Sequence, residues 1–457
     1  MNTQNTKSQM NRRIFLCSAA ATGAGLMFAQ TILTQAGERK AEDINVALIG
    51  AGQQGYVLLN TCLKIPGVRF KAVCDIWEAY NQKRAAGLLK KYGHDLRSYV
   101  DYREMLDKEK DLDAVIIATP DFRHAEQTIG CLKAGLHIYC EKEMSNNLED
   151  ARKMVLAARE AGKLLQIGHQ RRSNPRYIHC CEKLLSDAKI LGRITTVNGQ
   201  WNRAAHGPAG WPRGKEIDAA TLSRYGFESM DQFMNWRWYK KFGGGPMVDL
   251  GSHQIDVYSW FLGANPVSVI ASGGTDYYDK KDHEWYDNVM AIFEYQTKQG
   301  PVRAFYQTQT ANSCNGYFET FMGDQGTLLI SEASYRGQLY PEQKELYEQW
   351  MAWVKKGYLA QPVAKEAQKE EKTDETKTLY AVETPDSEKR PEFKLPIAME
   401  KPYHQPHLEN FFDAIRGKAK LTCPGEIAYE SAVAVLKVNE AVEAGRKLEF
   451  KPDEFKV

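Results

Sequence analysis

The sequence has almost no excess of either charge. Its 457 residues include 60 Lys and Arg against 58 Asp and Glu, which gives a formal net charge of +2. Without a broad basic surface, the chain has no electrostatic footprint for nucleic acid or anionic lipid. No uninterrupted apolar run reaches the length of about 18 residues that a stable membrane span needs. The 43% of apolar residues excludes disorder along the whole chain, so we expect a soluble globular protein of two or three domains.

The cysteines also lack an informative pattern. There are nine, with no C-x-x-C pair and no spacing typical of zinc ligands. We interpret them as small buried apolar side chains and predict no metal site.

The first 40 residues are typical of a targeting segment. Arg12 and Arg13 directly precede a weakly apolar stretch that ends at about Leu33. This pattern resembles a twin-arginine signal, whose pathway exports folded proteins, so residues 1–40 predict a periplasmic or otherwise exported protein. The alternative is a chance pair of arginines in a disordered tail, because no clear cleavage site follows.

A glycine-rich turn comes next. Ile44–Ile49 is a short β-branched run typical of a buried strand, and a GxGxxG sequence behind it opens a helical pattern. Gly50 permits a tight turn, Gly52 admits a pyrophosphate close to the backbone, and Gly55 lets the helix pack on the strand. The helix N-terminus, which includes Gln53, offers free N–H groups to the phosphates.

A second predicted strand, Val68–Cys74, ends at Asp75, which lies 20 residues after Gly55. An acidic side chain at this place accepts hydrogen bonds from the adenosine ribose and repels a 2′-phosphate. The pattern therefore predicts NAD as cofactor in preference to NADP, although Arg84 could weaken that preference.

Strands and helices continue to alternate up to residue 168, which predicts a doubly wound parallel sheet, a Rossmann domain, over residues 41–168. Ligands of such sheets lie at the carboxyl ends of the strands. We therefore expect cofactor contacts from the residues at two of these ends and in the helix that follows one of them, which are Thr119, Pro120, Asp121, His124, Glu141 and Lys142.

Farther along, a run of three glycines leads into the sequence PMVDLGSHQID. If this is the start of a helix, Asp249 and His253 are four residues apart and share a face. An N-cap role for Asp249 and a core position for His253 are the structural alternatives.

At this point the chain resembles the glucose-fructose oxidoreductase and inositol dehydrogenase family (Gfo/Idh/MocA). The matching segments are VALIGAGQQG, ATPDFRHAEQTIGCLKAGLHIYCEKEMS, GHQRRSNPRY and GGGPMVDLGSHQID. In that family, the lysine of an E-K-P motif and the Asp and His of a D-x-x-x-H helix surround the reacting carbon. The resemblance implies that Lys142, Asp249 and His253 are catalytic.

One residue departs from the family pattern: Glu143 stands where the motif has proline. Proline favours a cis peptide bond, so either a non-proline cis bond or a different local turn is expected here.

The resemblance also implies a second, α+β domain with an open, mostly antiparallel sheet, which we place at residues 169–340, and homo-oligomers that form through this sheet. Strand-like runs support it at 194–201, 267–272, 289–295, 302–310, 317–321 and 327–330. Residues 341–400 are charged and irregular and read as a surface insertion. Within residues 401–457, helices are expected at about 404–415 and 427–444.

For substrate, we expect contacts from Arg171 and Tyr177 of the GHQRRSNPRY segment, from Trp236 and Trp238, and from His253. Aromatic faces suit the C–H faces of sugars, and core packing is the alternative for any of these rings, as it is for Trp201, Trp211 and Tyr239.

Together these features predict an NAD(H)-dependent oxidoreductase that acts on a secondary hydroxyl of a sugar or glycoside, with position three of the ring as a candidate. His253 is the expected general acid/base. Because no NAD pool exists outside the cytoplasm, an exported enzyme would exchange hydride between sugars with a tightly bound cofactor. Two alternatives remain: an NAD-dependent glycosidase that oxidises, eliminates, adds water and reduces, and a non-catalytic NAD and carbohydrate-binding protein.

Overall fold

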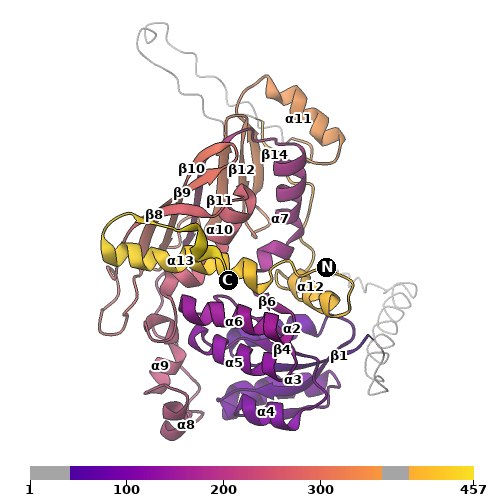
Figure 1. Ribbon diagram of the computed structural model, residues 1–457, viewed down its shortest axis with the longest axis vertical. Coiled ribbons are helices and arrows are strands. Elements are labelled where there is room, and N and C mark those ends of the chain that lie inside the picture. The colour runs from indigo at the N-terminus through magenta and orange to yellow at the C-terminus, as the bar shows by residue number, and fades with distance from the viewer. Residues whose placement is uncertain (1–41, 363–390) are drawn as a thin grey trace, which may run out of the picture.

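The computed structural model describes residues 42–362 and 391–457. The predicted signal, residues 1–40, and residues 363–390 of the predicted insertion lie outside the described residues. Two sheet domains are stacked along the long axis, with the parallel sheet at one end and the larger sheet at the other (Figure 1). The predicted fold class, a Rossmann domain followed by an open, mostly antiparallel sheet domain, is confirmed.

The first domain holds a six-stranded parallel sheet in the order β3-β2-β1-β4-β5-β6. Its strands are β1 (Ile44–Ile49), β2 (Val68–Cys74), β3 (Arg97–Tyr99), β4 (Ala114–Ile117), β5 (His137–Cys140) and β6 (Leu165–Ile167). Its helices are α2 (Gln53–Cys62), α3 (Lys83–Lys91), α4 (Tyr102–Lys108), α5 (Asp121–Lys133) and α6 (Leu148–Ala161).

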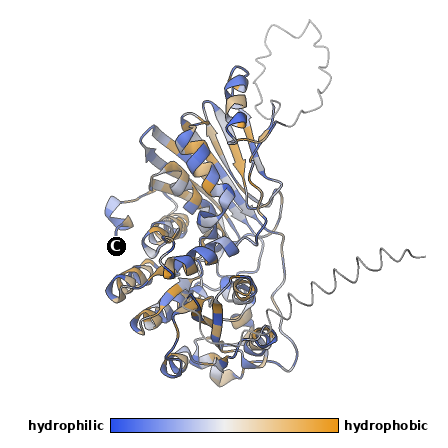
Figure 2. Cartoon of the chain, turned by 90° about the vertical axis from the view of Figure 1, so that its right-hand side faces the viewer, coloured by the Kyte–Doolittle hydropathy of each residue, from blue (hydrophilic) through white to orange (hydrophobic). Residues whose placement is uncertain are grey.

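Alternate residues of each strand pack on opposite faces of this sheet, because side chains in a strand alternate with period two. In β1, Ala47 and Ile49 join the core that includes α4, α5 and α6. Val46 and Leu48 join the core on the other face, with α2 and α3. Both faces are therefore covered, as Figure 2 shows by the apolar residues between helices and sheet.

The second of these cores is completed by the far end of the chain. Helix α12 (Gln405–Ile415) contributes Leu408, Phe411 and Phe412 to the core that contains β1 and α2. Tyr139 of β5 meets Phe411 edge to face at 5.9 Å. The dinucleotide domain therefore includes a C-terminal helix.

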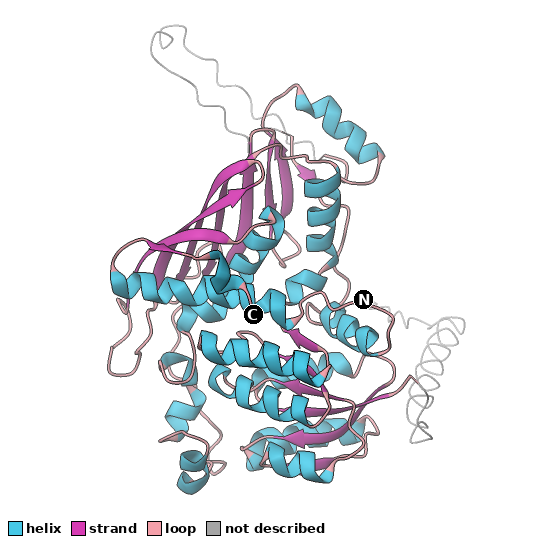
Figure 3. Cartoon of the chain, viewed as in Figure 1, coloured by secondary structure: helices cyan, strands magenta, loops and turns pink. Residues whose placement is uncertain are grey.

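The second domain is a nine-stranded sheet in the order β14-β13-β12-β11-β7-β10-β9-β8-β15 (Figure 3). Its strands are β7 (Ile194–Asn202), β8 (Pro266–Gly274), β9 (Asn288–Thr297), β10 (Gly300–Gln309), β11 (Tyr317–Gly323), β12 (Gly326–Ile330), β13 (Gly337–Pro341), β14 (Phe393–Lys394) and β15 (Leu448–Glu449). Only β7 and β10 pair in parallel among these described strands.

Two long helices, α10 (Gly245–Leu262) and α13 (Gly425–Ala444), cover one face of this sheet and pack on each other. Large apolar side chains of β8 and β9 remain 41–46% exposed, namely Val267, Ile270, Met290 and Ile292.

The segment read as an irregular insertion begins with a packed helix instead. In α11 (Leu346–Lys355), Trp350 is 1% exposed and its ring lies 5.4 Å from that of Phe393 in β14. Residues 363–390 lie outside the described part of the chain.

Residues 203–244, which we call the roof segment, connect β7 to α10. They carry α8 (Ala219–Arg224), α9 (Met230–Met234) and the short helix η4 (Trp236–Trp238), and descend beside the parallel-sheet domain (Figure 1). Ile217, Leu222 and Phe242 of this segment form an apolar cluster with Trp77 and Phe122 of the Rossmann domain. The roof segment is thus fixed to a domain far from it in sequence.

The described cysteines are all free thiols. Six are buried, Cys181 is half-buried and Cys314 is exposed, so the interpretation as buried apolar residues is wrong for Cys314. In the described ranges, no helix is both long and apolar enough to cross a membrane.

Candidate active site

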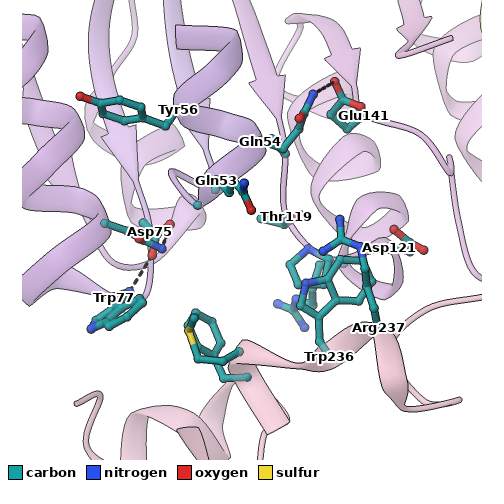
Figure 4. A pocket seen from close by; sticks show the side chains of 18 of the residues that line it. Gln53, Gln54, Tyr56, Asp75, Trp77, Thr119, Asp121, Glu141, Trp236 and Arg237 are labelled. Atoms are coloured by element: carbon teal, nitrogen blue, oxygen red, sulfur yellow. Dashed lines mark hydrogen bonds between the residues drawn. The ribbon is translucent and has the colours of Figure 1, made fainter. Parts of the chain in front are cut away.

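A single cavity of about 1130 Å³ follows the carboxyl edge of the parallel sheet. The GxGxxG turn and Asp75 line one end, and Lys142, Asp249 and His253 line the other. The roof segment closes it from outside with Phe233, Trp236 and other residues. Figure 4 shows Trp236 and Arg237 of the roof beside Asp121 on one side of the cavity, with Asp75 and Trp77 on the other.

The glycines of the turn meet the backbone closely. Gly50 has φ +87°, and a Cβ there would lie 2.7 Å from the Ala118 carbonyl. A Cβ on Gly55 would lie only 1.9 Å from the Gly50 oxygen, whereas one on Gly52 would meet nothing nearer than the Asn81 amide at 3.9 Å. Close contacts with the main chain therefore require glycine at positions 50 and 55. The space beside Gly52 is open, and this is where the backbone of a dinucleotide-binding turn lets a pyrophosphate come close.

Asp75 closes the far end of this cradle. One carboxylate oxygen accepts from the Ala51 N–H and the other from the Trp77 N–H, both at 2.7 Å. Burial raises the pKa of Asp75 to about 6. The oxygen beside Ala51 also accepts from the Asn81 amide at 3.4 Å, so the oxygen bonded to Trp77 is the one that keeps a second lone pair for a ribose hydroxyl. Arg84, which was expected to weaken the preference for NAD, lies over the Tyr56 ring at 4.3 Å.

Thr119, Pro120 and Asp121 at the strand ends all line the cavity, and their contact with the cofactor stays a prediction. The prediction that His124 contacts the cofactor is wrong in the structure, because this ring is 1% exposed and its nitrogens lie 2.7 and 2.8 Å from the Thr119 and Glu143 carbonyl oxygens. His124 joins two cavity loops from behind.

Glu141 and Gln53 line the cavity as well. The Gln54 amide donates to the Glu141 carboxylate at 3.0 Å, and the same amide nitrogen lies 2.9 Å from the His404 ring. Glu141 therefore ties the end of β5 to the first turn of α2, and His404 brings the C-terminal segment to the cavity wall.

Lys142 and Asp249 lie at the centre of the cavity end that also holds His253, which we call the catalytic end after the residues predicted to be catalytic. The Lys142 ammonium donates to the Asp249 carboxylate at 2.8 Å and to its backbone oxygen at 2.6 Å. The peptide bond between Lys142 and Glu143 is cis, so the first of the two expected alternatives applies. Asp249 lies one turn inside α10, which begins at Gly245, and is not its N-cap.

A second cation holds the same carboxylate. The Arg237 guanidinium of the roof segment donates to the other oxygen of Asp249 at 3.3 Å. Burial alone would raise the pKa of Asp249, but Lys142 and Arg237 hold it well below its usual range. Asp249 is therefore an anion that positions Lys142.

His253 lies one turn farther along α10, on the same face. Its ring is 6% exposed and lies 5.3 Å from the Trp201 ring. Burial, and then the positive charge of Lys142, lower the pKa of His253 well below its usual value. The imidazole is therefore neutral and able to accept a proton.

Asp121 adds a group of opposite character. Burial and the nearby Asp249 raise the pKa of Asp121 to about 7. Near neutral pH, the Asp121 carboxyl is protonated in part of the molecules and can then donate a proton, whereas the neighbouring Asp249 stays ionised.

The predicted substrate contacts divide into two groups. Trp236, Trp238 and His253 line the cavity. Arg171 and Tyr177 do not, and the prediction for them is corrected: Arg171 is paired with Glu319 and Glu332, and Tyr177 donates to Glu319 at 2.8 Å. Both side chains are at most 1% exposed, because the buried carboxylates hold them in the core.

Sequence reasoning missed Arg237, Arg203 and His404, which also line the cavity. Arg237 stands between the two predicted tryptophans, which was an available signal. Arg203 and His404 had none, because only the fold brings them to the cavity. Among the described residues, no group of three or more His, Cys, Asp or Glu is arranged to hold a metal ion.

The fold and the site define a two-domain dinucleotide-binding protein with a polar pocket at the nicotinamide end of its cleft. Residues 44–169 match the model described as an oxidoreductase family with an NAD-binding Rossmann fold, and residues 214–450 match that family's C-terminal alpha/beta domain. The chain belongs to this family, Gfo/Idh/MocA, as the motifs predicted. Its first domain is an NAD-binding domain, and the open cradle at Gly52 and the free lone pair of Asp75 fit that cofactor.

Curated relatives match part of the chain. The 1,5-anhydro-D-fructose reductase of Ensifer adhaerens is 29% identical over 227 residues, which are 50% of this chain and 59% of that protein. The inositol 2-dehydrogenase of Rubrobacter xylanophilus is 32% identical over 167 residues, 36% of this chain and 45% of the relative. The chain thus spans about half the length of these relatives.

Solved structures match along nearly the whole fold. Levoglucosan dehydrogenase in complex with NADH has a TM-score of 0.63 at 17% identity and covers 90% of this chain and 99% of its own. The aldose-aldose oxidoreductase of Caulobacter crescentus has a TM-score of 0.64 at 19% identity, and the match covers 89% of this chain and 100% of that protein's chain. These likenesses concern the fold.

Proposed function

We propose that this protein is an NAD(H)-dependent oxidoreductase that acts on a secondary hydroxyl of a sugar or glycoside, with position three of the ring as the candidate. The observation that carries the proposal is the cluster of Lys142, Asp249 and His253 in one cavity with the dinucleotide cradle. A neutral base and a fixed ammonium side by side are what removal of a hydroxyl proton needs.

The roles follow from the geometry. His253 accepts the hydroxyl proton, because its imidazole is neutral and lines the cavity. Lys142 donates a hydrogen bond to the substrate oxygen and stabilises negative charge that develops there. Asp249 keeps the ammonium in place through the 2.8 Å contact. NAD, when bound, supplies the hydride acceptor.

The roof segment supports a cofactor that stays bound during the cycle. The Trp77 indole donates to the Lys215 carbonyl, and the Phe122 N–H donates to the Phe242 carbonyl at 3.2 Å. Arg224 of the roof pairs with Asp101 at 2.9 Å. Since the cavity runs beneath these contacts, NAD leaves only when the apolar cluster of the roof opens.

A retained cofactor agrees with export. We propose that the twin-arginine pattern at residues 12–13 directs the folded, NAD-loaded protein out of the cytoplasm, where hydride exchange between two sugars returns the cofactor to its starting state. The fold is shared with a protein named for a reaction between aldoses. Export is tested by cell fractionation: replacing Arg12 and Arg13 by Lys should leave the protein in the cytoplasm.

A redox-neutral glycosidase is the second candidate. It is favoured by Asp121, whose pKa of about 7 keeps a proton available at the catalytic end for a leaving group. Oxidation, elimination of the aglycone, hydration and reduction would then return NAD unchanged.

Mass spectrometry of the native purified protein, with and without candidate glycosides, separates these functions. We expect NAD to co-purify and a keto sugar to appear. Release of free sugar from a glycoside without an added acceptor would favour the glycosidase. If NAD is bound but no glycoside gives a product, the result supports a non-catalytic NAD and carbohydrate-binding protein.

We also propose a homo-oligomer through the open face of the large sheet. Its support is the exposed apolar row of Val267, Ile270, Met290 and Ile292. Light scattering of an Ile292→Lys variant should show smaller particles than the parent, and an unchanged mass would contradict this interface.

A further inference from the structure

A small side cavity opens beside the catalytic end of the main cavity. It has a volume of about 80 Å³ and shares Arg203, Arg237, Trp238 and Asp249 with the main cavity. This volume is many times smaller than that of the main cavity. The side cavity is thus too small for a second sugar ring and admits a compact substituent.

His283, in the loop between β8 and β9, forms part of its wall. The ring is packed on both faces, with Trp238 at 3.7 Å and Tyr278 at 4.0 Å between centroids. It is 8% exposed, and neither ring nitrogen has a hydrogen-bond partner among the described residues. Buried polar groups are normally partnered, so the edge of this imidazole offers a hydrogen bond to a ligand.

Two arginines and two aspartates line the side cavity, and they differ in the partners that they already have. The Arg203 guanidinium lies over the Trp201 ring at 5.3 Å, and no described carboxylate forms an ion pair with it. Asp249 is already bound by Lys142 and Arg237. Asp287 is also engaged, since its carboxylate accepts backbone N–H groups of residues 276, 277 and 278 at 2.9–3.2 Å. Arg203 is therefore the arginine of this cavity that has no ion-pair partner among the described residues.

We propose that the side cavity binds an anionic oxygen group, a carboxylate or a sulfate, carried by the sugar whose hydroxyl is oxidised beside His253. Arg203 supplies the charge, and His283 donates a hydrogen bond from the inner wall. The inference rests on the proposed function and narrows its substrate class from sugars in general to acidic glycosides.

A matched set of probes tests this. Methyl β-D-glucuronide and methyl β-D-glucoside differ only in whether the exocyclic carbon is a carboxylate or a hydroxymethyl group, and the glucoside sulfated at that carbon is the third probe. Calorimetry on the NAD-loaded protein measures binding, and NADH fluorescence measures reduction of the bound cofactor. We expect at least one of the anions to bind about tenfold more tightly than the neutral glucoside or better, since charge-assisted hydrogen bonds are the strong ones.

The two anionic probes distinguish the sources of the group. Preference for the glucuronide assigns a carboxylate, and preference for the sulfated glucoside assigns a sulfate. Equal or tighter binding of the neutral glucoside overturns the inference. Absence of NADH with every probe, despite preferential binding of an anion, counts against the proposed function and leaves the side cavity assigned.

Two variants locate the effect. In Arg203→Gln the preference for the anion should fall about tenfold, and His283→Phe, which keeps the stacked ring, should reduce it by a smaller factor. Arg152→Gln removes an exposed arginine of α6 remote from the cavity and should leave the preference unchanged. If Arg203→Gln binds both glycosides in the parental ratio, the guanidinium does not recognise the anion and the inference fails.

Discussion

The two ends of the cavity are built in different ways. The dinucleotide end is mostly backbone and small residues from one short stretch, Gly50 to Asp75, and its shape depends on glycines that meet main-chain atoms. The other end is made of charged side chains that follow β5, or belong to α10 and the roof segment, and Lys142 lies 107 residues from its partner Asp249. One end is specified by local geometry and the other by long-range ion pairing, so substitutions should damage them differently.

The largest effect is expected at the charged end. His253→Ala should lower turnover by about 10²–10⁴-fold, the usual contribution of a general base, and should leave bound NAD in place. Turnover of the NAD-loaded variant and its NAD content measure the two separately. His179→Ala, which removes a histidine bonded to the Tyr358 carbonyl far from the cavity, is the matched control. Full activity in His253→Ala would show that His253 is not the general base.

The next effect concerns the stability of that end. Burial raises the pKa of Glu143 to about 8, against 4.5 for a free carboxyl. Between these values the folded protein keeps a proton that the unfolded chain releases, so the parent loses stability as pH rises. Glu143→Gln removes this loss. Between these two pH values, the free energy of unfolding measured in urea should fall in the parent relative to the variant by up to about 1.4 kcal/mol per pH unit. If the free energies of both proteins change in parallel with pH, the prediction is wrong.

The dinucleotide end should show a contrast between two glycines. Gly52→Ala places its Cβ in open space, so we expect normal stability and NAD binding weakened by about tenfold or more. Gly55→Ala collides with the Gly50 oxygen, so stability and NAD should be lost together. NAD content and urea unfolding check both variants, and a full load of NAD in Gly52→Ala would show that no phosphate approaches that backbone.

The smallest effect is expected where the roof segment meets the Rossmann domain at the surface. Arg224 is 67% exposed in its pair with Asp101, and exposed pairs contribute about 0–1 kcal/mol. Arg224→Ala should therefore speed NAD release by about fivefold at most, because the apolar cluster still holds the roof. Release is followed by exchange of bound NADH for NAD. A much larger acceleration would mean that the ion pair, and not the cluster, retains the cofactor.

What the sequence could predict follows the same division. Val68–Cys74 has the predicted bounds, because a buried strand is encoded by its local apolar pattern. Arg171 was misplaced because its partner Glu319 is 148 residues away, and no local pattern tells a buried paired arginine from one in a pocket. The two-residue strands β14 and β15 were missed because a strand that short has no periodicity.

The roof segment was also beyond local reasoning. Its helices were not predicted, since α8 and α9 span only six and five residues and owe their order to contact with Trp77 and Phe122. Arg237 enters the site only because this segment crosses from one domain to the other. His253 and Lys142, in contrast, which we propose as catalytic, were reached through the family motifs.

Helix α12 has a consequence for the timing of biosynthesis. Leu408, Phe411 and Phe412 fill one flank of a domain whose strands are translated first. Until α12 has been synthesised, the nascent chain exposes that flank, because Tyr139 and Leu58 have no α12 side chains to pack against. The core of the nucleotide-binding half is therefore complete only once α12 has been synthesised, and a truncation just before residue 405 should yield an insoluble product although every glycine of the cradle is present.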